Sequence, residues 1–229
     1  MKHFEAEKTV DRLFVLDGCQ DGPVKTILRE AKKQDTMVQY VKKERLDQLS
    51  ETKNHQGVIA YCAACEYAEV SDILENAKKK GEAPFIVLLD GIEDPHNLGA
   101  IIRTANQAGA HGVIIPKRRA VGLTATVART SAGAVNYTPV AKVTNLVTVM
   151  EDLKKEGMWF VCADMDGEEM YSLNLKGPIG LVIGNEGEGV SRLVKEHCDM
   201  VASIPMKGDI DSLNASVAMG VLAYEIVRQ

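Results

Sequence analysis

The sequence lacks any apolar run close to the roughly 20 residues that a membrane-spanning helix requires. Its opening, MKHFE, is charged and has no apolar stretch like that of a secretory signal peptide. We therefore expect a cytoplasmic protein with no membrane partner. The 229 residues, 45% hydrophobic and 26% charged, can bury a substantial core as one large or two small domains.

Cysteine is scarce and scattered. The five cysteines, an odd number, are Cys19, Cys62, Cys65, Cys162 and Cys198, which favours reduced thiols over a disulfide framework. Cys62 and Cys65 form one C-x-x-C pair without a second Cys or His pair at zinc-binding spacing. The five histidines are dispersed along the chain. We therefore expect no metal site.

The glycine patterns of two common nucleotide-binding classes are also missing. Gly184, Gly187 and Gly189 have the wrong spacing for a dinucleotide fingerprint, and no lysine followed by Ser or Thr completes a P-loop. An oxidoreductase, which would bind nicotinamide tightly, therefore loses support. The formal net charge of -5 argues against indiscriminate nucleic-acid binding but is compatible with a local basic surface.

The part of the chain before residue 84 predicts a small α/β unit and a linker. Residues 1–66 form the unit, with strands expected at 12–16, 37–41 and 58–61 and helices at 24–34 and around Leu46. Residues 67–83 predict a linker helix that ends in three consecutive lysines.

Residues 84–229 predict a second α/β domain. Its expected strands are 85–89, 112–115, 159–163, 180–183 and 204–206, and its expected helices are 95–108, 124–130, 146–156, 191–196 and 212–227. Continuous apolar strands that alternate with helices are typical of a parallel sheet with helices on both faces. Because ligands bind such sheets beyond the carboxyl ends of the strands, the candidate loops follow Leu89, Ile115, Ile183 and Pro205.

The helix expected at 95–108 presents one polar side chain of interest. Asp94 is the expected N-cap and Pro95 suits the first helical position. Arg103 falls opposite the apolar stripe, four residues after Gly99, so we expect no side chain to block access to it. Arg103 remains open to two interpretations, as a solvated surface residue or as a ligand contact.

Basic residues gather after the strand at 112–115. Lys117, Arg118 and Arg119 are consecutive, and Arg129 lies at the end of the next helix. At a ligand-side loop of a net-acidic protein, these side chains are candidate contacts for RNA phosphates. A solvated surface is the alternative interpretation.

Two polar loops in the last quarter of the chain suggest one site. GNEGEG, at residues 184–189, combines glycines that permit close backbone approach with Glu186. Glu188 lies two residues further on and need not converge with Glu186, so we expect at most one of them to be central. SLNAS, at residues 212–216, opens the last helix and contains the polar Asn214.

Three motifs in a fixed order resemble those of a known family. They are DPHNLG at 94–99 with Arg103 and Thr104, IGNEGEG at 183–189, and IPM at 204–206 with SLNASVA at 212–218. They are similar to the motifs of the SpoU family, RNA ribose 2′-O-methyltransferases of the SPOUT superfamily. The resemblance covers nearly the whole chain, because residues 1–66 resemble the family's small RNA-substrate-binding domain. Residues 84–229 then correspond to its catalytic domain.

The resemblance implies several properties that periodicity alone does not predict. The catalytic domain is expected to end in a trefoil knot, although true knots are otherwise nearly absent from proteins. S-adenosylmethionine is the implied methyl donor, held largely by backbone groups, and a homodimer with sites near the subunit interface is implied. Small residues on the last helix fit close packing of that kind or an ordinary core: Ala215, Ser216, Ala218, Gly220 and Ala223.

The resemblance also assigns residue roles. The catalytic positions are Asn97, Arg103, Glu186, Ser212 and Asn214, and the donor-binding positions are Gly184, Asn185, Ile204, Met206 and Leu213. A ribose hydroxyl attacks the sulfonium methyl group, and it is a poor nucleophile until it loses its proton. Because a guanidinium stays protonated, we expect Arg103 to be an electrostatic clamp on the developing alkoxide and the adjacent phosphate. We expect Glu186 to hold either Arg103 or the loop.

The leading function is therefore ribose methylation of a guanosine in ribosomal RNA, and transfer RNA is the alternative substrate. A protein that binds RNA or ribosome precursors without catalysis is the alternative from another class, and the intact catalytic motif positions disfavour it. One departure concerns the N-terminal domain. Family members usually begin with an additional strand and helix, and their absence here is open to two interpretations, an N-terminally incomplete domain or genuine divergence.

Overall fold

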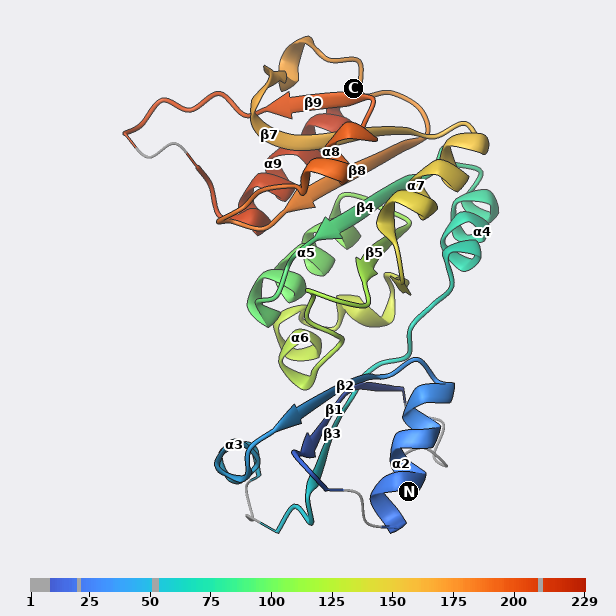
Figure 1. Cartoon of the computed structure of the whole chain (residues 1–229). Coiled ribbons are helices and arrows are strands. Elements are labelled where there is room, and N and C mark those ends of the chain that lie inside the picture. The colour runs from blue at the N-terminus through green and yellow to red at the C-terminus, as the bar shows by residue number, and fades with distance from the viewer. Residues whose placement is uncertain (1–8, 20–21, 51–53, 210–211) are drawn as a thin grey trace. The chain divides into compact units, whose positions relative to one another are not determined.

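The structure is a computed structural model that describes residues 9–19, 22–50, 54–209 and 212–229. The chain divides into two compact units, and Figure 1 labels many of their helices and strands. The described residues up to Glu66, together with Gly122–Ala125, belong to the first unit. Tyr67–Val121 and Thr126–Gln229 make up the second unit.

The first unit contains a small mixed sheet. Within its described residues, β1 (Val10–Leu16), β2 (Met37–Val41) and β3 (Val58–Cys62) pair in the order β2-β1-β3, with β1 parallel to β2 and antiparallel to β3. The helices are α2 (Gly22–Lys33) and α3 (Lys43–Leu49). Leu13 and Val15 on β1 share a core with Val24 and Ala31 on α2. The predicted α/β character of this region is confirmed.

The second unit is built on a parallel sheet. Its strands among the described residues are β4 (Phe85–Asp90), β5 (Gly112–Pro116), β6 (Val140–Val143), β7 (Trp159–Glu169), β8 (Ile179–Gly184) and β9 (Met200–Ser203). They pair in parallel in the order β6-β5-β4-β8-β7-β9. Every residue of β4 and β8 is buried, as expected for central strands covered on both faces. The predicted parallel sheet is confirmed.

Helices cover both faces of this sheet (Figure 1). On one face lie α4 (Val70–Lys80), α7 (Leu146–Lys155) and α8 (Arg192–Glu196), whose Ile73, Met150 and Val194 share a core with Leu88 and Phe160 of the strands. On the other face α5 (Pro95–Gln107) packs against α9 (Ala215–Arg228). The remaining elements in the described ranges are α6 (Ala125–Thr130) and the 3-10 turns η1 (Ala134–Asn136) and η2 (Met170–Ser172). Among the described residues, no helix has both the length and the apolar character needed to cross a bilayer.

Local sequence explains where α5 begins and ends. Asp94 Oδ1 accepts a hydrogen bond from His96 N at 2.9 Å, and Pro95 occupies the first turn. Gly109, with φ of 76°, follows the last turn, where a left-handed conformation favours glycine. The apolar stripe predicted for this helix is buried, and it consists of Leu98, Ile101, Ile102, Ala105 and Ala108.

Two expectations for the second unit are wrong, and one of its strands was not predicted. The strand expected at 204–206 is a loop, and β9 lies just before it; Pro205 has no N–H to donate to a strand ladder. The last helix begins at Ala215 rather than Ser212, because Asn214 is its N-cap and accepts a hydrogen bond from Ser216 N at 3.0 Å. The four-residue strand β6 was not predicted, because so short a run has little alternation to detect.

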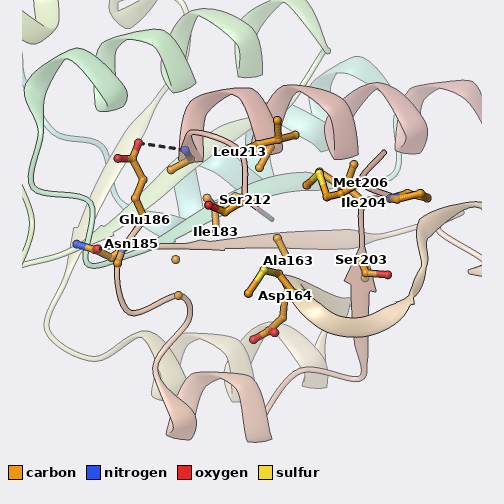
Figure 2. Close-up of a pocket in the computed structure, with 18 of the residues that line it drawn as sticks. Ala163, Asp164, Ile183, Asn185, Glu186, Ser203, Ile204, Met206, Ser212 and Leu213 are labelled. Carbon is orange, nitrogen blue, oxygen red and sulfur yellow. Dashed lines mark hydrogen bonds between the residues drawn. The ribbon is translucent and has the colours of Figure 1, made fainter. Parts of the chain in front are cut away.

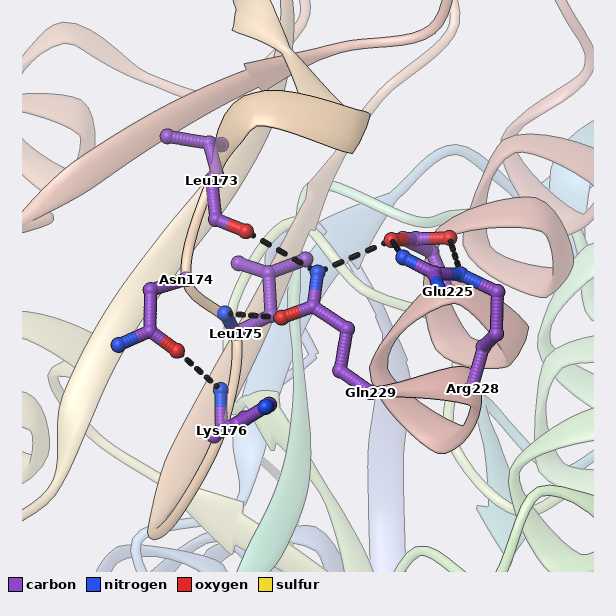
Figure 3. Close-up of polar contacts among 7 residues, drawn as sticks. All are labelled: Leu173, Asn174, Leu175, Lys176, Glu225, Arg228 and Gln229. Carbon is purple, nitrogen blue, oxygen red and sulfur yellow. Dashed lines mark hydrogen bonds and ion pairs between the residues drawn. The ribbon is translucent and has the colours of Figure 1, made fainter.

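The last turn of α9 is tied to the connection between β7 and β8 (Figure 3). Gln229 Nε2 donates to Leu173 O at 3.0 Å, and Gln229 Oε1 accepts from Leu175 N at 2.9 Å. Glu225, with a side chain only 3% exposed, accepts from Arg228 Nη2 at 2.6 Å and from Arg228 Nε at 2.8 Å. The hydrogen bonds from Arg228 and then Gln229 lower the pKa of Glu225 to about 2, although burial opposes them. One end of α9 is therefore fixed.

Candidate active site

A cavity of about 660 Å³ opens beyond the carboxyl ends of β7, β8 and β9 (Figure 2). Its wall comes from the end of β7, the loop after β8, and the segment that runs from β9 into α9. Apolar side chains line part of it, including Ala163, Ile183, Ile204 and Leu213. Carboxylates line another part, namely Asp164, Glu169, Glu186 and Glu188. The cavity lies where ligands of parallel sheets usually bind.

The loop after β8 is closed tightly by its own backbone. Asn185 N donates to Gly189 O at 3.1 Å, Gly189 N donates to Asn185 O at 2.8 Å, and Asn185 Oδ1 accepts from Gly187 N at 2.7 Å. A Cβ atom on Gly184 would lie only 2.1 Å from the carbonyl carbon of Gly189. Gly184 is therefore required by the close approach of two backbone segments.

The same loop is anchored to the end of β4, which leads into α5. Asn185 Nδ2 donates to Gly91 O at 2.9 Å. Ser191 N donates to Asp90 Oδ2 at 2.8 Å, and Asp90 is only 9% exposed. A buried carboxylate needs such a partner, because an unpaired one is costly. These contacts position the loop against the strand that delivers the first motif.

Glu186 connects three segments that are far apart in the sequence. Its Oε1 accepts from Asn97 Nδ2 at 2.9 Å, from Ala215 N at 3.2 Å (Figure 2), and from Asn214 Nδ2 in a short hydrogen bond. Asn214 Nδ2 also lies 3.0 Å from Asn97 Oδ1. Hydrogen bonds to an ionised acceptor are among the stronger ones in proteins. The carboxylate therefore holds the starts of α5 and α9 against the loop after β8.

Arg103 lies outside this hydrogen-bonded cluster. Its side chain is exposed on α5 and has no hydrogen-bond or ion-pair partner among the described residues. Glu186 was expected to hold either Arg103 or the loop after β8. In the structure it bonds to the starts of α5 and α9 and so holds the loop, and it does not pair with Arg103. The open space expected at Gly99 is also wrong, because a Cβ atom there would lie 1.8 Å from Thr130 Oγ1. Arg103 is accessible because it lies on the outer face of α5.

The predicted donor-binding residues all lie in the cavity wall: Gly184, Asn185, Ile204, Met206 and Leu213. Two predicted catalytic residues, Glu186 and Ser212, also line it. Asn97 and Asn214 reach the wall through Glu186, and Arg103 does not line the cavity. The fold therefore brings nine of these ten positions to one cluster, counting the two asparagines, and leaves Arg103 on a neighbouring surface.

Sequence reasoning missed the contribution of β7. Asp164 and Glu169 line the cavity from this strand. Asp164 Oδ2 pairs with Lys195 Nζ at 2.7 Å, and Asp164 Oδ1 accepts from Asp166 N at 3.1 Å. Burial acts to raise the pKa of Asp164, but the hydrogen bonds, chiefly from Lys195, outweigh it and lower that pKa. A usable signal existed, since Asp164 directly follows an apolar run in a parallel strand.

The predicted RNA-contact residues lie away from the cavity. Lys117, Arg118 and Arg119 follow β5, and Lys117 N donates to Val143 O at 2.7 Å. Arg118, Arg119 and Arg129 are exposed, and none of the four basic residues lines the cavity. Within the described ranges, no group of three or more His, Cys, Asp or Glu side chains is arranged to hold a metal ion.

Family models match both parts of the chain. A model described as the SpoU rRNA Methylase family matches residues 84–224, and one described as RNA 2′-O ribose methyltransferase substrate binding matches residues 3–68. A relative from Bacillus subtilis (strain 168) is 48% identical over 227 residues, which cover 98% of this chain and 90% of the relative. It carries the provisional name TrmH family tRNA/rRNA methyltransferase YacO.

Solved structures agree with these matches. The SpoU methyltransferase AviRb from Streptomyces viridochromogenes, in complex with the cofactor AdoMet, has a TM-score of 0.64 and 26% identity, covering 99% of this chain and 85% of that chain. An RNA 2′-O ribose methyltransferase has a TM-score of 0.58 and 26% identity, covering 100% and 84%. The fold and the matches define an RNA methyltransferase. The chain belongs to the SpoU rRNA Methylase family.

S-adenosylmethionine is the cofactor of this enzyme family, and the cavity fits it. The volume of about 660 Å³ falls within the range of roughly 300–1,000 Å³ that is usual for small-molecule sites. The lining combines apolar surface with carboxylates such as Asp164 and Glu169, which complement the positive charges of the donor. When bound, the donor supplies an electrophilic methyl group on a sulfonium sulfur.

Proposed function

We propose that this enzyme methylates the ribose 2′-hydroxyl of a guanosine in ribosomal RNA, with transfer RNA as the alternative substrate. The observation that carries the proposal is the hydrogen-bonded cluster of Glu186, Asn97 and Asn214, one residue from each of the three motifs, beside a donor-sized cavity. The relatives' names cover both RNA classes, and the family description names ribosomal RNA.

In the proposed mechanism, Arg103 binds the substrate at the mouth of the site. Its exposed guanidinium is free of partners among the described residues and so is available to a ribose oxygen and the neighbouring phosphate. Because arginine remains protonated, its charge stabilises the alkoxide that forms as the 2′-hydroxyl loses its proton. The clamp is worth most in the transition state, where the negative charge develops.

Glu186, Asn97 and Asn214 are proposed to keep the site ordered, and Ser212 contributes a hydroxyl to the cavity wall. The shared carboxylate oxygen fixes the first turn of α5, which places Arg103 two turns further along the same helix. Gly184, Asn185, Ile204, Met206 and Leu213 are proposed to hold the donor through backbone and apolar contacts.

The architecture is proposed to follow the family. Residues 1–66 would bind RNA, residues 67–83 would join the domains through α4, and residues 84–229 would catalyse transfer. We propose that the segment leading into α9 completes a trefoil knot beside the loop after β8, a topology supported by the contacts of Glu186 with Asn214 and Ala215. Lys117, Arg118, Arg119 and Arg129 are proposed RNA phosphate contacts.

We also propose a homodimer that acts in the cytoplasm, where ribosomal and transfer RNA function. Exposed apolar side chains on α9 support the dimer, because an unpartnered apolar surface favours association. They are Val217, Tyr224 and Val227, with exposed fractions of 49%, 51% and 53%. Sedimentation of the purified protein measures this directly, and a monomer at micromolar concentration would contradict it.

The substrate assignment is tested by mapping ribose methylation across cellular RNA with and without the gene. We expect one guanosine in ribosomal RNA to lose its 2′-O-methyl group when the gene is removed. Loss of a methyl group from a transfer RNA nucleotide would favour the alternative substrate. An unchanged map, with donor still bound by the protein, would favour RNA binding or ribosome assembly without catalysis.

The role of Arg103 is tested separately with Arg103→Ala. Methyl transfer should be abolished while the donor dissociation constant stays close to that of the wild type, because Arg103 does not line the cavity. Near-normal turnover by this variant would eliminate the proposed clamp.

A further inference from the structure

The surface beside Arg103 is formed by a segment that packs on α5 at two points. Thr130 Oγ1 occupies the space over Gly99, and Thr138 Oγ1 accepts a hydrogen bond from Asn106 Nδ2 at 3.0 Å. On a helical wheel, positions 99 and 106 lie about 40° and 60° from position 103, and they flank it along the axis. Arg103 therefore emerges from α5 beside the segment of residues 130–138.

This segment is held in one conformation. Ser131 and Thr138 are 0% and 1% exposed. The chain reverses at Ala132 and Gly133, with φ of 50° and 86°, and the main chain of Tyr137 donates to Ala134 O at 2.9 Å. Non-glycine residues at positive φ persist only where the surrounding structure fixes them. The segment is therefore a rigid support next to the proposed catalytic helix.

Tyr137 stands out on this support. Its side chain is 79% exposed, the largest value among the large apolar side chains of the described residues. Its hydroxyl has no hydrogen-bond partner within the described part of the chain. Tyr137 directly precedes the buried Thr138, so their α-carbons are about 3.8 Å apart. A freely accessible ring is thus attached to an anchored backbone.

We propose that Tyr137 stacks on an unpaired base of the substrate RNA next to the target nucleotide. This inference rests on the proposed function, in which Arg103 clamps the target ribose and its phosphate. Sequence-specific and single-stranded RNA recognition depends on bases that stack on exposed aromatic side chains. A support that is already ordered adds little entropic cost when the base binds. Arg129, exposed in the last turn of α6 and one residue before this segment, is suited to the phosphate of that neighbouring nucleotide.

The test compares Tyr137→Ala with Tyr137→Phe in the full-length protein, using an RNA that the wild type methylates. Tyr137→Ala should weaken RNA binding about 5- to 150-fold, the effect of losing one base–aromatic stack. Tyr137→Phe keeps the ring and should stay within about twofold of the wild type. The donor dissociation constant, measured by calorimetry, should be unchanged in both variants. Trp159→Ala is the control, because Trp159 is 58% exposed but begins β7, which four strand positions separate from β6, the strand that follows Tyr137.

RNA with an abasic site at each position around the target identifies the stacked base. When the abasic site removes the stacked base, the RNA affinity of the wild type should fall by the same factor as the Tyr137→Ala substitution causes with intact RNA. The RNA affinity of Tyr137→Ala should not fall further with this abasic RNA. Unchanged RNA binding by Tyr137→Ala would overturn the inference, as would equal losses in the Ala and Phe variants. A shift of Tyr137→Ala from dimer to monomer would also overturn it by assigning the ring to a subunit contact. Failure of the proposed function is distinct, because the wild type itself would then transfer no methyl group.

Discussion

Replacement of Glu186 by alanine removes one carboxylate oxygen that accepts from Asn97, Asn214 and Ala215. In buried settings a hydrogen bond to a charged group contributes about 1.5–3 kcal/mol, and we take about 1 kcal/mol each because Glu186 is exposed. The three hydrogen bonds then contribute about 3 kcal/mol in total. If all of this energy orders the site for the transition state, its loss in Glu186→Ala lowers kcat/KM about 150-fold.

The loop itself offers a matched control. Glu188 lies two residues away, is equally charged and exposed, and has no partner among the described residues. Glu188→Ala removes a carboxylate from the cavity wall but breaks no hydrogen bond, so it should lose less methyl transfer than Glu186→Ala. Glu186→Gln keeps a neutral acceptor oxygen, so its kcat/KM for methyl transfer should lie between those of Glu186→Ala and the wild type. Steady-state methyl transfer to RNA, with donor affinity measured in parallel, checks this order.

A double-mutant cycle makes the reasoning sharper. Asn214→Ala removes one of the donors to Glu186, so its effect should be strongly non-additive with that of Glu186→Ala. Equal losses in Glu186→Ala and Glu188→Ala would refute the structural argument, since it predicts a difference between them. A loss below about threefold in Glu186→Ala would also refute it.

Two further predictions concern the cavity wall and the end of α9. Gly184→Ala should lower both the thermal midpoint and donor affinity, because its Cβ would lie 2.1 Å from the Gly189 carbonyl carbon; Gly187→Ala, whose Cβ would have its nearest contact at 3.5 Å, is the control in calorimetry. The pKa of Glu225 is depressed to about 2 by Arg228 and Gln229, so the stability it contributes is present above the unfolded pKa of 4.5 and is lost as pH falls toward 2. In urea denaturation the free energy of unfolding of the wild type should exceed that of Glu225→Gln at neutral pH. This difference in free energy should shrink as the pH falls from 4.5 toward 2. A difference that stays constant with pH would contradict the assignment.

The sheet could be predicted from the sequence because its strands carry strong signals. β4 and β8 are apolar at nearly every position and buried throughout, which distinguishes central parallel strands from amphipathic elements. The start of α5 was equally clear, since Asp94 and Pro95 act at the first turn. The four-residue β6 and the shift of β9 to Met200–Ser203 escaped prediction, because pairing partners decide such short strands and the local pattern does not.

Part of the candidate site could also be predicted from the sequence. Motif spacing identified Glu186, Asn97 and Asn214, but only the fold reveals that they share one carboxylate oxygen. The role of Gly99 was misjudged, because a missing side chain is equally consistent with open space and with a close neighbour such as Thr130. Asp164 directly follows an apolar run, which marks a strand end, but only the pairing of β7 with β8 and β9 shows that this strand end faces the same cavity as the loop after β8.

The central claim is that this chain transfers a methyl group to a ribose 2′-hydroxyl of RNA. The most direct measurement incubates the purified protein and its Arg103→Ala variant with labelled S-adenosylmethionine and unmodified ribosomal or transfer RNA, followed by nucleoside analysis. We predict label in 2′-O-methylguanosine with the wild type and none with the variant. Label in a base-methylated nucleoside, or equal transfer by the variant, would contradict the account.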